Sequence, residues 1–380
     1  MRSLHVISSL MPEGGGPSYT VPRLTEALAA TGWEAQIAAL ETPAASTKRG
    51  VPISDFGRNT VLIPSLAKLG RSRAMSQKLG ELGSDVIHAH GLWMMPSIYA
   101  ARVAKTTGQP FVLAPRGMLG ADALRFSATA KRLFWAIWQQ RAVAQVSCFH
   151  ATAESELEDI RAFGLSAPVA IIPNGVDLPN RTYIAETTGA PFVLSLGRLH
   201  PKKGLECLIS AFSRVAPEFP DWQLRIVGMD EGGHSDALRR AISVAGLQDR
   251  IHVEGPVFGE EKFDLMARAS LFVLPSLHEN FAVTVAESLA VETPVISSKG
   301  APWRGLEVHG CGWWIDHGVE PLAASLSHSM ALTPEARAAM GKLGREWMRC
   351  DFAWVGIGER TAQVYDWLLG RGPQPPFVFS

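Results

Sequence analysis

Two carboxylates, Glu279 and Glu287, lie eight positions apart in the stretch HENFAVTVAESLAVETPVI. A helix that begins near Ala282 would place Glu287 on a face whose other members are mostly apolar. That face, spaced at three and four residues, consists of Val283, Thr284, Glu287 and Val291. A buried ionised carboxylate is costly unless a hydrogen-bond donor satisfies it. We therefore expect either a protein donor or a ligand hydroxyl beside Glu287.

The start of this helix is a second candidate binding feature. The first backbone N–H groups of a helix lack partners within it and lie at the positive end of its dipole, which favours phosphate. The residues concerned are Phe281, Ala282 and Val283. An ordinary helix start that binds no ligand is the alternative.

Two cations, Arg198 and Lys203, follow a predicted strand in the segment LSLGRLHPKKGLE. Both leave the predicted sheet at its carboxyl edge. Arginine offers a planar fork for phosphate oxygens and lysine offers a mobile point charge, so the two together would neutralise a diphosphate. A solvated basic turn is the alternative.

A glycine-rich turn, PEGGGPS, lies between the first predicted strand and its helix. Its glycines, Gly15 and Gly16 among them, would let the backbone approach a ligand without Cβ clashes. The turn is not a dinucleotide-binding fingerprint, because Tyr19 stands where G-x-G-x-x-G needs its third glycine. A flexible turn without a ligand is the alternative.

Two histidines, His88 and His90, lie on the same face of the predicted strand DVIHAH. Their spacing would suit a metal pair, but the sequence reveals no third ligand, and we predict no metal site. His90 ends the strand and is therefore our candidate for a catalytic residue in a cleft. A structural histidine with satisfied hydrogen bonds is the alternative. Arg116 leaves the next predicted strand in the same direction.

The elements that must position these groups belong to two predicted domains. A chain of 380 residues exceeds the ~250–300 residues at which one core usually stops growing. With 47% hydrophobic and 19% charged residues, the composition is that of a globular protein and excludes a disordered one. The net charge is zero, but residues 1–150 hold 16 Lys and Arg against 8 Asp and Glu, so this part is basic.

Short apolar runs alternate with longer amphipathic ones, which predicts parallel sheets covered by helices on both faces. The predicted strands are 4–10, 85–90, 110–115 and 169–173 in a first set, and 191–197, 222–228, 250–255, 270–275 and 293–298 in a second. We predict an α/β fold of two doubly wound Rossmann-like domains, 1–178 and 188–352, joined by the polar stretch 177–191. A ligand cleft is expected at the carboxyl ends of their strands, and a helix at about 355–370 is expected to pack back on the first domain.

Cysteine spacing and the first residues bear on the compartment. The four cysteines are too far apart for a C-x-x-C pair, which suits a reducing cytoplasm. The apolar run before Pro12 is too short for a signal peptide, and no segment reaches 18 apolar residues. We predict a cytoplasmic protein that is at most peripheral at the inner face of the cell membrane.

Four stretches together resemble a known family: SLMPEGGGPSYTVPRLTEALAATGWEAQI, IPNGVD, SLGRLHPKKGLECLISAF and HENFAVTVAESLAVETPVI. In this order they are similar to the large retaining glycosyltransferase family with the GT-B fold, called family 4 or group 1. The last stretch resembles the two-glutamate signature of that family. The resemblance implies a nucleoside-diphosphate sugar, with UDP or GDP, as the donor substrate and no further cofactor.

The same resemblance implies roles for individual residues. Arg198 and Lys203 would bind the donor diphosphate, and Glu287 would bind the ribose hydroxyls. Glu279 would contact hydroxyls of the transferred sugar. The strand end HVEGPV, which closes at Val257, resembles the place where the family holds the nucleotide base by backbone contacts.

At one position the chain departs from the family. Many relatives carry a histidine after the strand that corresponds to PFVLAP, where this chain has Arg116. This weakens an assignment of His90 or Arg116 as the residue nearest the reacting carbon. Relatives that act in bacterial surface-polysaccharide assembly are similar in HGLWMMPS, PRGML and GAPWRGLEVHGCGWWI. Their similarity suggests a role in making exopolysaccharide, O-antigen or capsule.

The implied mechanism depends on charge. When the sugar–phosphate bond breaks, negative charge grows on the nucleoside diphosphate, and two cations with a helix end would stabilise it. No Asp-x-Asp metal site is apparent, so the implied transfer is metal-independent. Retention of configuration would follow from attack on the same face, with the departing phosphate taking the acceptor proton.

Other functions stay open at this point. An NAD-dependent oxidoreductase would share the doubly wound domains, but it needs the G-x-G-x-x-G turn that the first loop lacks. A non-catalytic sugar-nucleotide-binding protein would not need both the acidic and the basic pair. An epimerase or a phosphorylase with the GT-B fold is a further alternative.

Basic residues in the first domain suggest where an acceptor binds. Residues 42–80 hold seven Lys and Arg against one acid, and RFSATAKRLFWAIWQQR (125–141) holds four more cations. Phe134 and Trp138 are spaced to pack on the sheet, so Trp135 is the better candidate for a membrane interface. We predict docking on an anionic membrane surface and a saccharide or lipid-linked saccharide acceptor. No nucleic-acid partner is expected.

Overall fold

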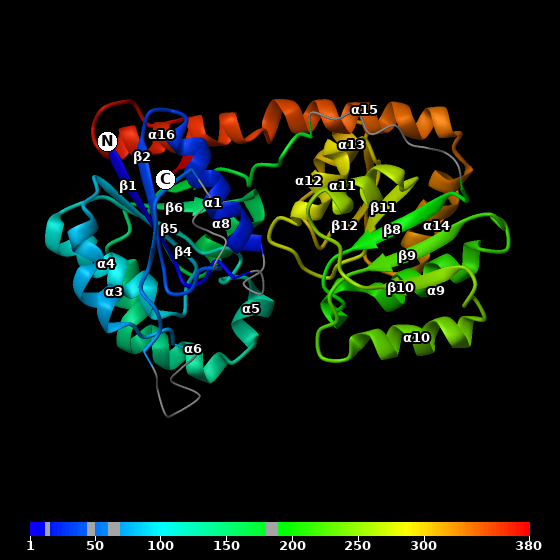
Figure 1. Ribbon diagram of the computed structural model, residues 1–380, viewed down its shortest axis with the longest axis horizontal. Coiled ribbons are helices and arrows are strands. Elements are labelled where there is room, and N and C mark those ends of the chain that lie inside the picture. Colours follow the sequence, from blue (N-terminus) through cyan, green and yellow to red (C-terminus); the bar gives the residue numbers. More distant parts are fainter. Residues whose placement is uncertain (12–15, 44–49, 60–68, 180–188) are drawn as a thin grey trace. The chain divides into compact units, whose positions relative to one another are not determined.

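The chain folds as two compact units, shown by the computed structural model in Figure 1. Unit 1 comprises Met1–Gly175 and Trp354–Ser380, and unit 2 comprises Val176–Ala353. The residues that the structure describes are 1–11, 16–43, 50–59, 69–179 and 189–380. Of the polar stretch predicted as a linker, residues 180–188 lie outside the described part.

Unit 1 is built on one sheet with the strand order β14-β7-β6-β5-β4-β1-β2-β3. Its strands are β1 (Arg2–Ile7), β2 (Glu34–Ala39), β3 (Ile53–Asp55), β4 (Val86–His90), β5 (Phe111–Ala114), β6 (Cys148–Ala151), β7 (Val169–Ile171) and β14 (Val378–Phe379). All neighbours pair in parallel except β14 with β7. The order reverses between β1 and β4, so their carboxyl ends flank the point where such sheets bind ligands.

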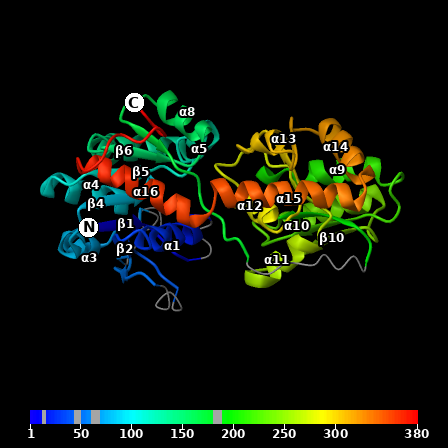
Figure 2. The same ribbon diagram turned by 90° about the horizontal axis from the view of Figure 1, so that it is seen from above.

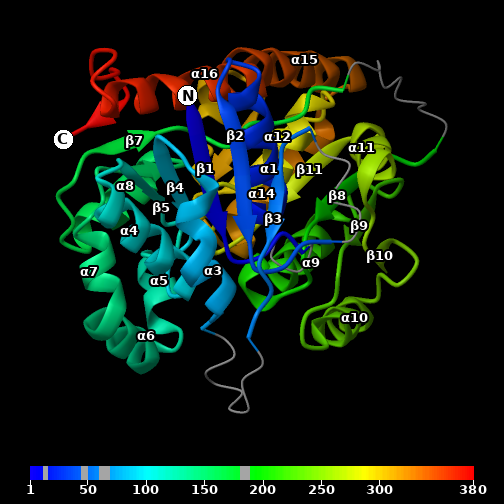
Figure 3. The same cartoon turned by 60° about the vertical axis from the view of Figure 1, so that its left-hand side comes forward.

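Helices cover both faces of this sheet (Figure 3). They are α1 (Gly16–Ala29), α3 (Arg73–Lys78), α4 (Met95–Thr107), α5 (Ala121–Arg125), α6 (Ala128–Phe134), α7 (Gln140–Val143), α8 (Glu154–Ala162) and α16 (Trp354–Leu368). Alternate strand residues serve opposite faces: Val112 of β5 packs with α1 and α16, whereas Phe111 and Leu113 pack with α3, α4 and α8. The near-continuous apolar runs predicted for these strands reflect this burial on both faces.

The helix α16 packs directly on α1 (Figure 2), although more than 300 residues of sequence separate them. The contact is close because Gly358 lies against the backbone of Ala27, where a Cβ atom would approach the Ala27 carbonyl oxygen to 2.4 Å. A residue larger than glycine would force the two helices apart. The first sheet is therefore covered by a helix from the far end of the chain.

Unit 2 repeats the architecture with the strand order β10-β9-β8-β11-β12-β13, all in parallel. Its strands are β8 (Phe192–Leu196), β9 (Gln223–Val227), β10 (Ile251–Glu254), β11 (Leu271–Leu274), β12 (Val295–Ser298) and β13 (Gly312–Ile315). The order reverses between β8 and β11. Their adjacent carboxyl ends are therefore the expected ligand-binding edge of this unit.

The helices of unit 2 also form two layers. They are α9 (Leu205–Val215), α10 (His234–Ala245), α11 (Gly259–Arg268), α12 (Val283–Ala290), α13 (Gly305–Val308), α14 (Val319–Ala331) and α15 (Pro334–Asp351). One core cluster joins α9, α10 and α14 to the sheet, and another joins α11, α12, α13 and α15 to the opposite face.

The predicted α/β fold of two doubly wound sheets is confirmed. Every strand predicted from an apolar run is present, with ends that differ by a few residues. Five further strands, β2, β3, β6, β13 and β14, were not predicted. Within the described part of the chain, each helix is too short or too polar to cross a lipid bilayer.

Candidate active site

Unit 2 brings Lys203 and Glu279 together at its ligand-binding edge. Lys203 follows β8 and Glu279 follows β11, and these strands are neighbours in the sheet. The Lys203 Nζ atom lies 2.5 Å from Glu279 Oε1, and the two side chains are 22% and 15% exposed. The basic and the acidic motif of the sequence are thus one ion pair in the structure.

A glycine makes this approach possible. The 3-10 turn Pro201–Lys203 ends at Gly204, whose φ of 66° lies in the left-handed region that favours glycine. A Cβ atom at Gly204 would stand 2.3 Å from the carbonyl oxygen of Pro275, in the loop that follows β11. Only glycine lets the loops after β8 and β11 touch, and their contact carries Lys203 to Glu279.

Arg198 lies at the same edge but is held more loosely. Its Nη1 atom donates to Glu231 Oε2 over 2.8 Å, and the two side chains are 61% and 44% exposed. Exposed ion pairs contribute only ~0–1 kcal/mol, so this one yields readily to a competing anion. A pocket over the ends of β8, β9 and β11 is lined by both Arg198 and Lys203.

Glu287 is buried, as the sequence predicted, and its partner is a protein donor. Its side chain on α12 is 4% exposed and accepts a hydrogen bond from Lys262 Nζ of α11 over 2.5 Å. Burial raises the pKa of Glu287, while the charge of Lys262 opposes that rise. The first of our two alternatives for this carboxylate is therefore present, and a ligand hydroxyl is not required to satisfy it.

The start of α12 has an unusual backbone. Ala282 precedes the helix with a φ of 63°, a left-handed conformation that is rare for a residue with a side chain. The preceding residue, Phe281, is buried, and its carbonyl accepts a hydrogen bond from Trp303 Nε1 over 2.5 Å. This turn fixes the position of the first backbone N–H groups of α12, which start at Val283. Val257, after β10, packs against the core cluster that includes α12.

The glycine-rich turn of unit 1 is only partly described. Gly15 lies outside the described residues, and Gly16 is the exposed first residue of α1. A Cβ atom at Gly16 would meet no other atom within 4 Å. Packing within the described part of the chain therefore does not demand glycine at this position.

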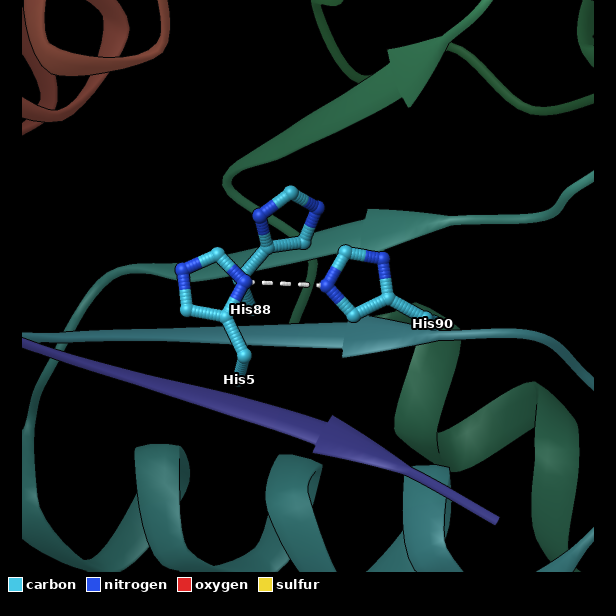
Figure 4. Close-up of side chains that lie close together, drawn as sticks. All are labelled: His5, His88 and His90. Carbon is cyan, nitrogen blue, oxygen red and sulfur yellow. Dashed lines mark hydrogen bonds between the residues drawn. The ribbon is translucent and has the colours of Figure 1, made fainter. Parts of the chain in front are cut away.

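His90 lies at the carboxyl end of β4 inside a buried histidine cluster (Figure 4). Its Nε2 atom is 3.1 Å from His5 Nδ1, and its Nδ1 atom is 3.1 Å from Arg116 Nη2. Both ring nitrogens are therefore hydrogen-bonded to protein groups, and only 6% of the residue is exposed. This geometry favours the structural alternative for His90 over direct contact with a substrate.

The expectation that no third potential metal ligand accompanies His88 and His90 is wrong, because His5 of β1 supplies one. The three rings come within 4.8 Å of one another through their nitrogen atoms. All six ring nitrogens of His5, His88 and His90, however, already pair with protein groups. The two nitrogens of His88 pair with Tyr365 and His150, and the His5 nitrogen that does not contact His90 pairs with Tyr365. The cluster fits a hydrogen-bonded network and does not fit a metal.

Arg116 completes the carboxyl edge of unit 1. Its Nη1 atom donates to Asn174 Oδ1 over 2.8 Å, beside the contact from Nη2 to His90. The residue has a φ of 57°, again in the left-handed region. The motif IPNGVD thus supplies Asn174 as a partner of Arg116.

The basic stretch 125–141 presents different residues from those predicted. Phe134 is buried, as expected, and Trp138 packs against it at 5.2 Å between ring centroids. Trp135, predicted as the better candidate for a membrane interface, is half-buried, and its ring packs on Phe163 at 4.7 Å between ring centroids and on Trp93. The exposed apolar side chains there are Phe126, Leu133 and Ile137. Of the other basic stretch, Lys48, Arg49 and Lys68 lie outside the described residues.

Several residues of these sites escaped the sequence reasoning. They are Lys262, Glu231, His5, His150, Tyr365 and Asn174. A signal existed for two of them, because His5 interrupts the apolar residues of the predicted strand 4–10 and His150 is the polar residue of the short apolar run CFHA. The others come from helices and loops that only the tertiary fold brings close.

Two family models match the chain. The model described as Glycosyl transferase 4-like domain matches residues 15–175, and the model described as Glycosyl transferases group 1 matches residues 180–347. Among curated proteins, the chain is similar to the GDP-mannose:cellobiosyl-diphosphopolyprenol alpha-mannosyltransferase of Xanthomonas oryzae pv. oryzae. The two are 25% identical over 312 residues, which are 78% of each chain.

Solved structures share the fold over nearly the whole chain. Sucrose-phosphate synthase from Thermosynechococcus elongatus superposes with a TM-score of 0.78 at 20% identity, covering 98% of this chain and 100% of that one. HepE from Anabaena, in complex with UDP and glucose, gives a TM-score of 0.76 at 20% identity and covers 96% and 99%. At this identity the likeness establishes the architecture.

Proposed function

The chain belongs to the group 1 glycosyltransferases with the GT-B fold, and from that premise we propose that it transfers a sugar from a nucleoside-diphosphate sugar to a saccharide acceptor. The observation that carries the proposal is the Lys203–Glu279 pair at the edge of β8 and β11, with Arg198 beside it. The name of the Xanthomonas relative supports a GDP-sugar, and the HepE complex supports a UDP-sugar.

The proposed chemistry depends on the leaving group. The bond between the anomeric carbon and the phosphate oxygen breaks, its electron pair stays on that oxygen, and negative charge grows on the nucleoside diphosphate. Lys203, Arg198 and the first N–H groups of α12 stabilise this charge more in the transition state than in the ground state. Before donor binding, Glu279 and Glu231 neutralise the two cations, and the more highly charged diphosphate competes with them.

We propose retention of configuration. The acceptor hydroxyl oxygen forms its bond to the anomeric carbon on the face that the phosphate leaves, and the hydroxyl proton passes to the departing phosphate oxygen. No separate general base is required. Glu279 then contacts hydroxyls of the transferred sugar. Because the cations supply the neutralisation, transfer should continue in EDTA, and a metal-reversible loss would contradict this part of the proposal.

The remaining predicted residues complete the proposed donor site. Lys262 orients Glu287, so that the carboxylate accepts hydrogen bonds from ribose hydroxyls. Backbone groups contribute the other contacts. They are those of Val257 to the base, Phe281, Ala282 and Val283 to the phosphates, and Gly15 and Gly16 to the bound donor.

The central test is the substitution Lys203→Ala. Loss of one preorganised charge at the leaving group should lower turnover by about 10²–10³-fold, more than it weakens binding of UDP or GDP. The neighbouring Lys202 is exposed and serves as a matched control, since Lys202→Ala removes a cation from the same turn. Unchanged turnover in Lys203→Ala, or an equal loss in Lys202→Ala, would contradict the assignment.

A second experiment identifies the base and tests Glu287. Thermal denaturation in UDP-, GDP- and ADP-sugars should single out one nucleotide, because a ligand at ~100 times its Kd stabilises by ~2.7 kcal/mol. With that nucleotide, Glu287→Gln should weaken binding of the nucleoside diphosphate by about 10- to 150-fold. A lower melting temperature with unchanged nucleotide affinity would instead leave Glu287 as the structural partner of Lys262.

We further propose that the acceptor is lipid-linked and belongs to bacterial surface-polysaccharide assembly. The support is the similarity of HGLWMMPS and PRGML to relatives in such pathways, and the diphosphopolyprenol in the name of the Xanthomonas relative. Unit 1 also carries a surface suited to an anionic membrane, which we call the basic-apolar patch. It comprises Arg125, Phe126, Arg132, Leu133, Ile137 and Arg141, all of them exposed.

Charge and apolar side chains act together in this patch. Each cation near an anionic bilayer contributes ~1 kcal/mol, and Phe126, Leu133 and Ile137 add apolar contact. Charge reversal at Arg132 and Arg141 should abolish sedimentation with anionic vesicles. Reversal of Arg102, an exposed arginine of α4 outside the patch, is the control. Equal partitioning of every variant to neutral and anionic vesicles would favour a soluble acceptor.

A further inference from the structure

The histidine cluster of unit 1 is closed by a backbone carbonyl at one end, and this fixes its protons. His150 Nε2 is 2.8 Å from the carbonyl oxygen of Ile172, so this nitrogen carries hydrogen. In a neutral ring the Nδ1 atom of His150 then accepts, and it does so from His88 Nε2 over 3.3 Å. His88 Nδ1 is left as an acceptor, and Tyr365 donates its hydroxyl proton to it over 2.7 Å.

The other half of the cluster follows from the same reasoning. The Tyr365 oxygen, having donated its proton, accepts from His5 Nε2 at 3.4 Å. His5 Nδ1 therefore accepts from His90 Nε2, and His90 Nδ1 accepts in turn from Arg116 Nη2. A guanidinium can only donate, so the chain of hydrogen bonds ends there. One proton arrangement satisfies every group from Arg116 to the Ile172 carbonyl.

In this arrangement all four histidines are neutral. A second proton on any ring would set two donors against each other. Burial is the main cause that lowers the pKa of His5 and of His150 to about 3, and it lowers the pKa of His88 and His90 well below the usual value. The cluster therefore holds Arg116 in place through hydrogen bonds, but it supplies no negative charge to balance the guanidinium.

One nearby carboxylate, that of Glu156, acts on Arg116 through its charge and raises the pKa of the guanidinium against the effect of burial. The carboxylate of Glu156 accepts hydrogen bonds from the N–H of Gly117 at 2.6 Å and from the N–H and the hydroxyl of Thr152. Among the described residues, no carboxylate forms an ion pair with Arg116, whose remaining partner is the neutral amide of Asn174. The Arg116 Nε atom is buried and has no hydrogen-bond partner in the described part of the chain.

Arg116 thus combines two unfavourable features at the carboxyl edge of β5. Burial lowers the pKa of its guanidinium to about 10, which still leaves the group charged at neutral pH. A desolvated charge that forms no ion pair with a described carboxylate is unfavourable, and so is a left-handed backbone at a residue with a side chain. Such costs concentrate where a ligand relieves them.

We propose that Arg116 binds a compact oxyanion, a phosphate or a carboxylate, carried by the acceptor. The guanidinium has the fork geometry for such groups, and its Nε–H lacks a protein partner. His90, His5, Tyr365, His88 and His150 act as positioning residues that orient the guanidinium without neutralising it. The inference rests on the proposed function in one respect, namely that unit 1 takes the acceptor.

The test is an NMR titration of the full chain labelled with ¹⁵N-arginine. The Nε–H signals of Arg116 and Arg198 are assigned from Arg116→Lys and Arg198→Lys, each of which removes one signal. Inorganic phosphate is added first, and glucuronate replaces it in a second titration. We expect a saturable shift of the Arg116 signal with at least one probe, while Arg102 on α4 shows no saturable shift. The responding probe tells whether the acceptor group is a phosphate or a sugar carboxylate.

The two arginines separate this inference from the donor site. Arg198 should respond to UDP or GDP whether or not Arg116 binds an anion. The Arg116 shift should persist in Lys203→Ala, which removes the main cation of the donor site. No saturable shift of Arg116 with either probe, while Arg198 responds to a nucleotide, would overturn the inference and leave the proposed function intact. A shift that vanishes in Lys203→Ala would also overturn it.

Discussion

The two units handle partly buried cations in opposite ways. In unit 2, Lys203 and Lys262 each lie 2.5 Å from a glutamate, so that each lysine forms an ion pair with a carboxylate. In unit 1, Arg116 meets a neutral histidine and a neutral asparagine. A paired cation is stable without a ligand, and under the proposed function Lys203 would exchange Glu279 for the donor diphosphate. A cation without an ion-pair partner is unfavourable when no ligand is bound, and it has no carboxylate to release when a ligand binds.

This difference suggests that the units impose different requirements on their ligands. Under the proposed function, the Lys203–Glu279 pair of unit 2 would admit a ligand charged strongly enough to displace the carboxylate, as a nucleoside diphosphate is. In unit 1, the Arg116 guanidinium would bind any oxyanion of the right size. Four neutral histidine rings hold the guanidinium in a fixed geometry. Perturbations that act on one kind of site and spare the other would test the contrast.

Acidification should separate the two clusters most strongly. The unfolded chain protonates histidine below about pH 6.5, whereas burial holds the folded pKa of His5 and His150 at about 3. The stability these rings contribute is complete above pH 6.5 and is lost as the pH falls toward 3, at about 1.4 kcal/mol per pH unit for each ring. Together they should destabilise unit 1 by about 4 kcal/mol between pH 6.5 and pH 5.

Glu287 in unit 2 should respond in the opposite direction. Burial raises its pKa, so its contribution to stability is complete below the unfolded pKa of 4.5 and is lost as the pH rises through the folded value. Hydrogen exchange, corrected for its intrinsic pH dependence, should therefore show β4 losing protection in acid before β11 does. Equal losses in both strands would contradict the contrast.

Removal of one partner from a buried pair should have the next largest effect. Lys262→Met leaves Glu287 buried without its cation, which should cost about 3 kcal/mol in the free energy of unfolding, measured with urea. Lys299→Met is the control, because Lys299 pairs with Asp316 at the surface and its loss should cost less than about 1 kcal/mol. If Lys262→Met is as mild as the control, the pair does not stabilise unit 2.

Interruption of the neutral network should cost less. Tyr365→Phe leaves His88 Nδ1 without its donor and His5 Nε2 without its acceptor, a loss of roughly 1–3 kcal/mol. Tyr99→Phe, in which a buried hydroxyl loses one contact with the Ser72 N–H, should be milder. Histidine ¹⁵N spectra should show changed tautomers in Tyr365→Phe. An unaltered tautomer pattern would refute the proton arrangement.

Arg116→Gln should have the smallest effect on stability. The glutamine amide still offers a donor toward His90, and the substitution removes a desolvated charge that forms no ion pair with a described carboxylate. The free energy of unfolding should therefore stay within about 0.5 kcal/mol of the original protein or rise by about 1 kcal/mol. A loss above about 2 kcal/mol would mean that Arg116 is needed for folding, and the unpaired charge would no longer point to a ligand.

The fold was predictable because a strand that is buried on both faces of its sheet is recognisable in the sequence as a short apolar run. Strands such as DVIHAH and SLFVLP are short apolar runs bounded by turns, and they are all present. The strands that were missed, such as β2 with EAQIAA and β13 with GWWI, alternate with small or polar residues or follow a helix without a clear break. Their place in the sheet depends on neighbours far along the chain.

Only those site residues that directly follow a strand were predictable from the sequence. Arg198, Lys203 and Glu279 each follow a strand, and parallel strands bring their carboxyl ends to one edge. Lys262 could not be found in this way, because the face that α11 turns toward α12 is decided by packing. Tyr365 is 277 residues from His88, with no local pattern to join them.

The prediction for Trp135 assumed a regular helix. A regular α-helical phase would separate Trp135 from Phe134 and turn it outward. The helix instead contains a π-helical turn over Trp135–Gln139, which adds a residue to the turn and changes the phase. Trp135 packs on Phe163, and Leu133 and Ile137 are exposed. Such turns have no reliable signal in a single sequence.

The packing of α16 on α1 also sets an order of events during synthesis. A ribosome delivers Val176–Ala353 before Trp354–Ser380, so unit 2 can fold while unit 1 still lacks α16 and the hydroxyl of Tyr365. Until then, the apolar face of α1 that carries Leu24 and Leu28 has no cover from α16. A nascent chain that stalls in this interval presents that face to chaperones and proteases, so the helix that finishes unit 1 also ends its exposure to quality control.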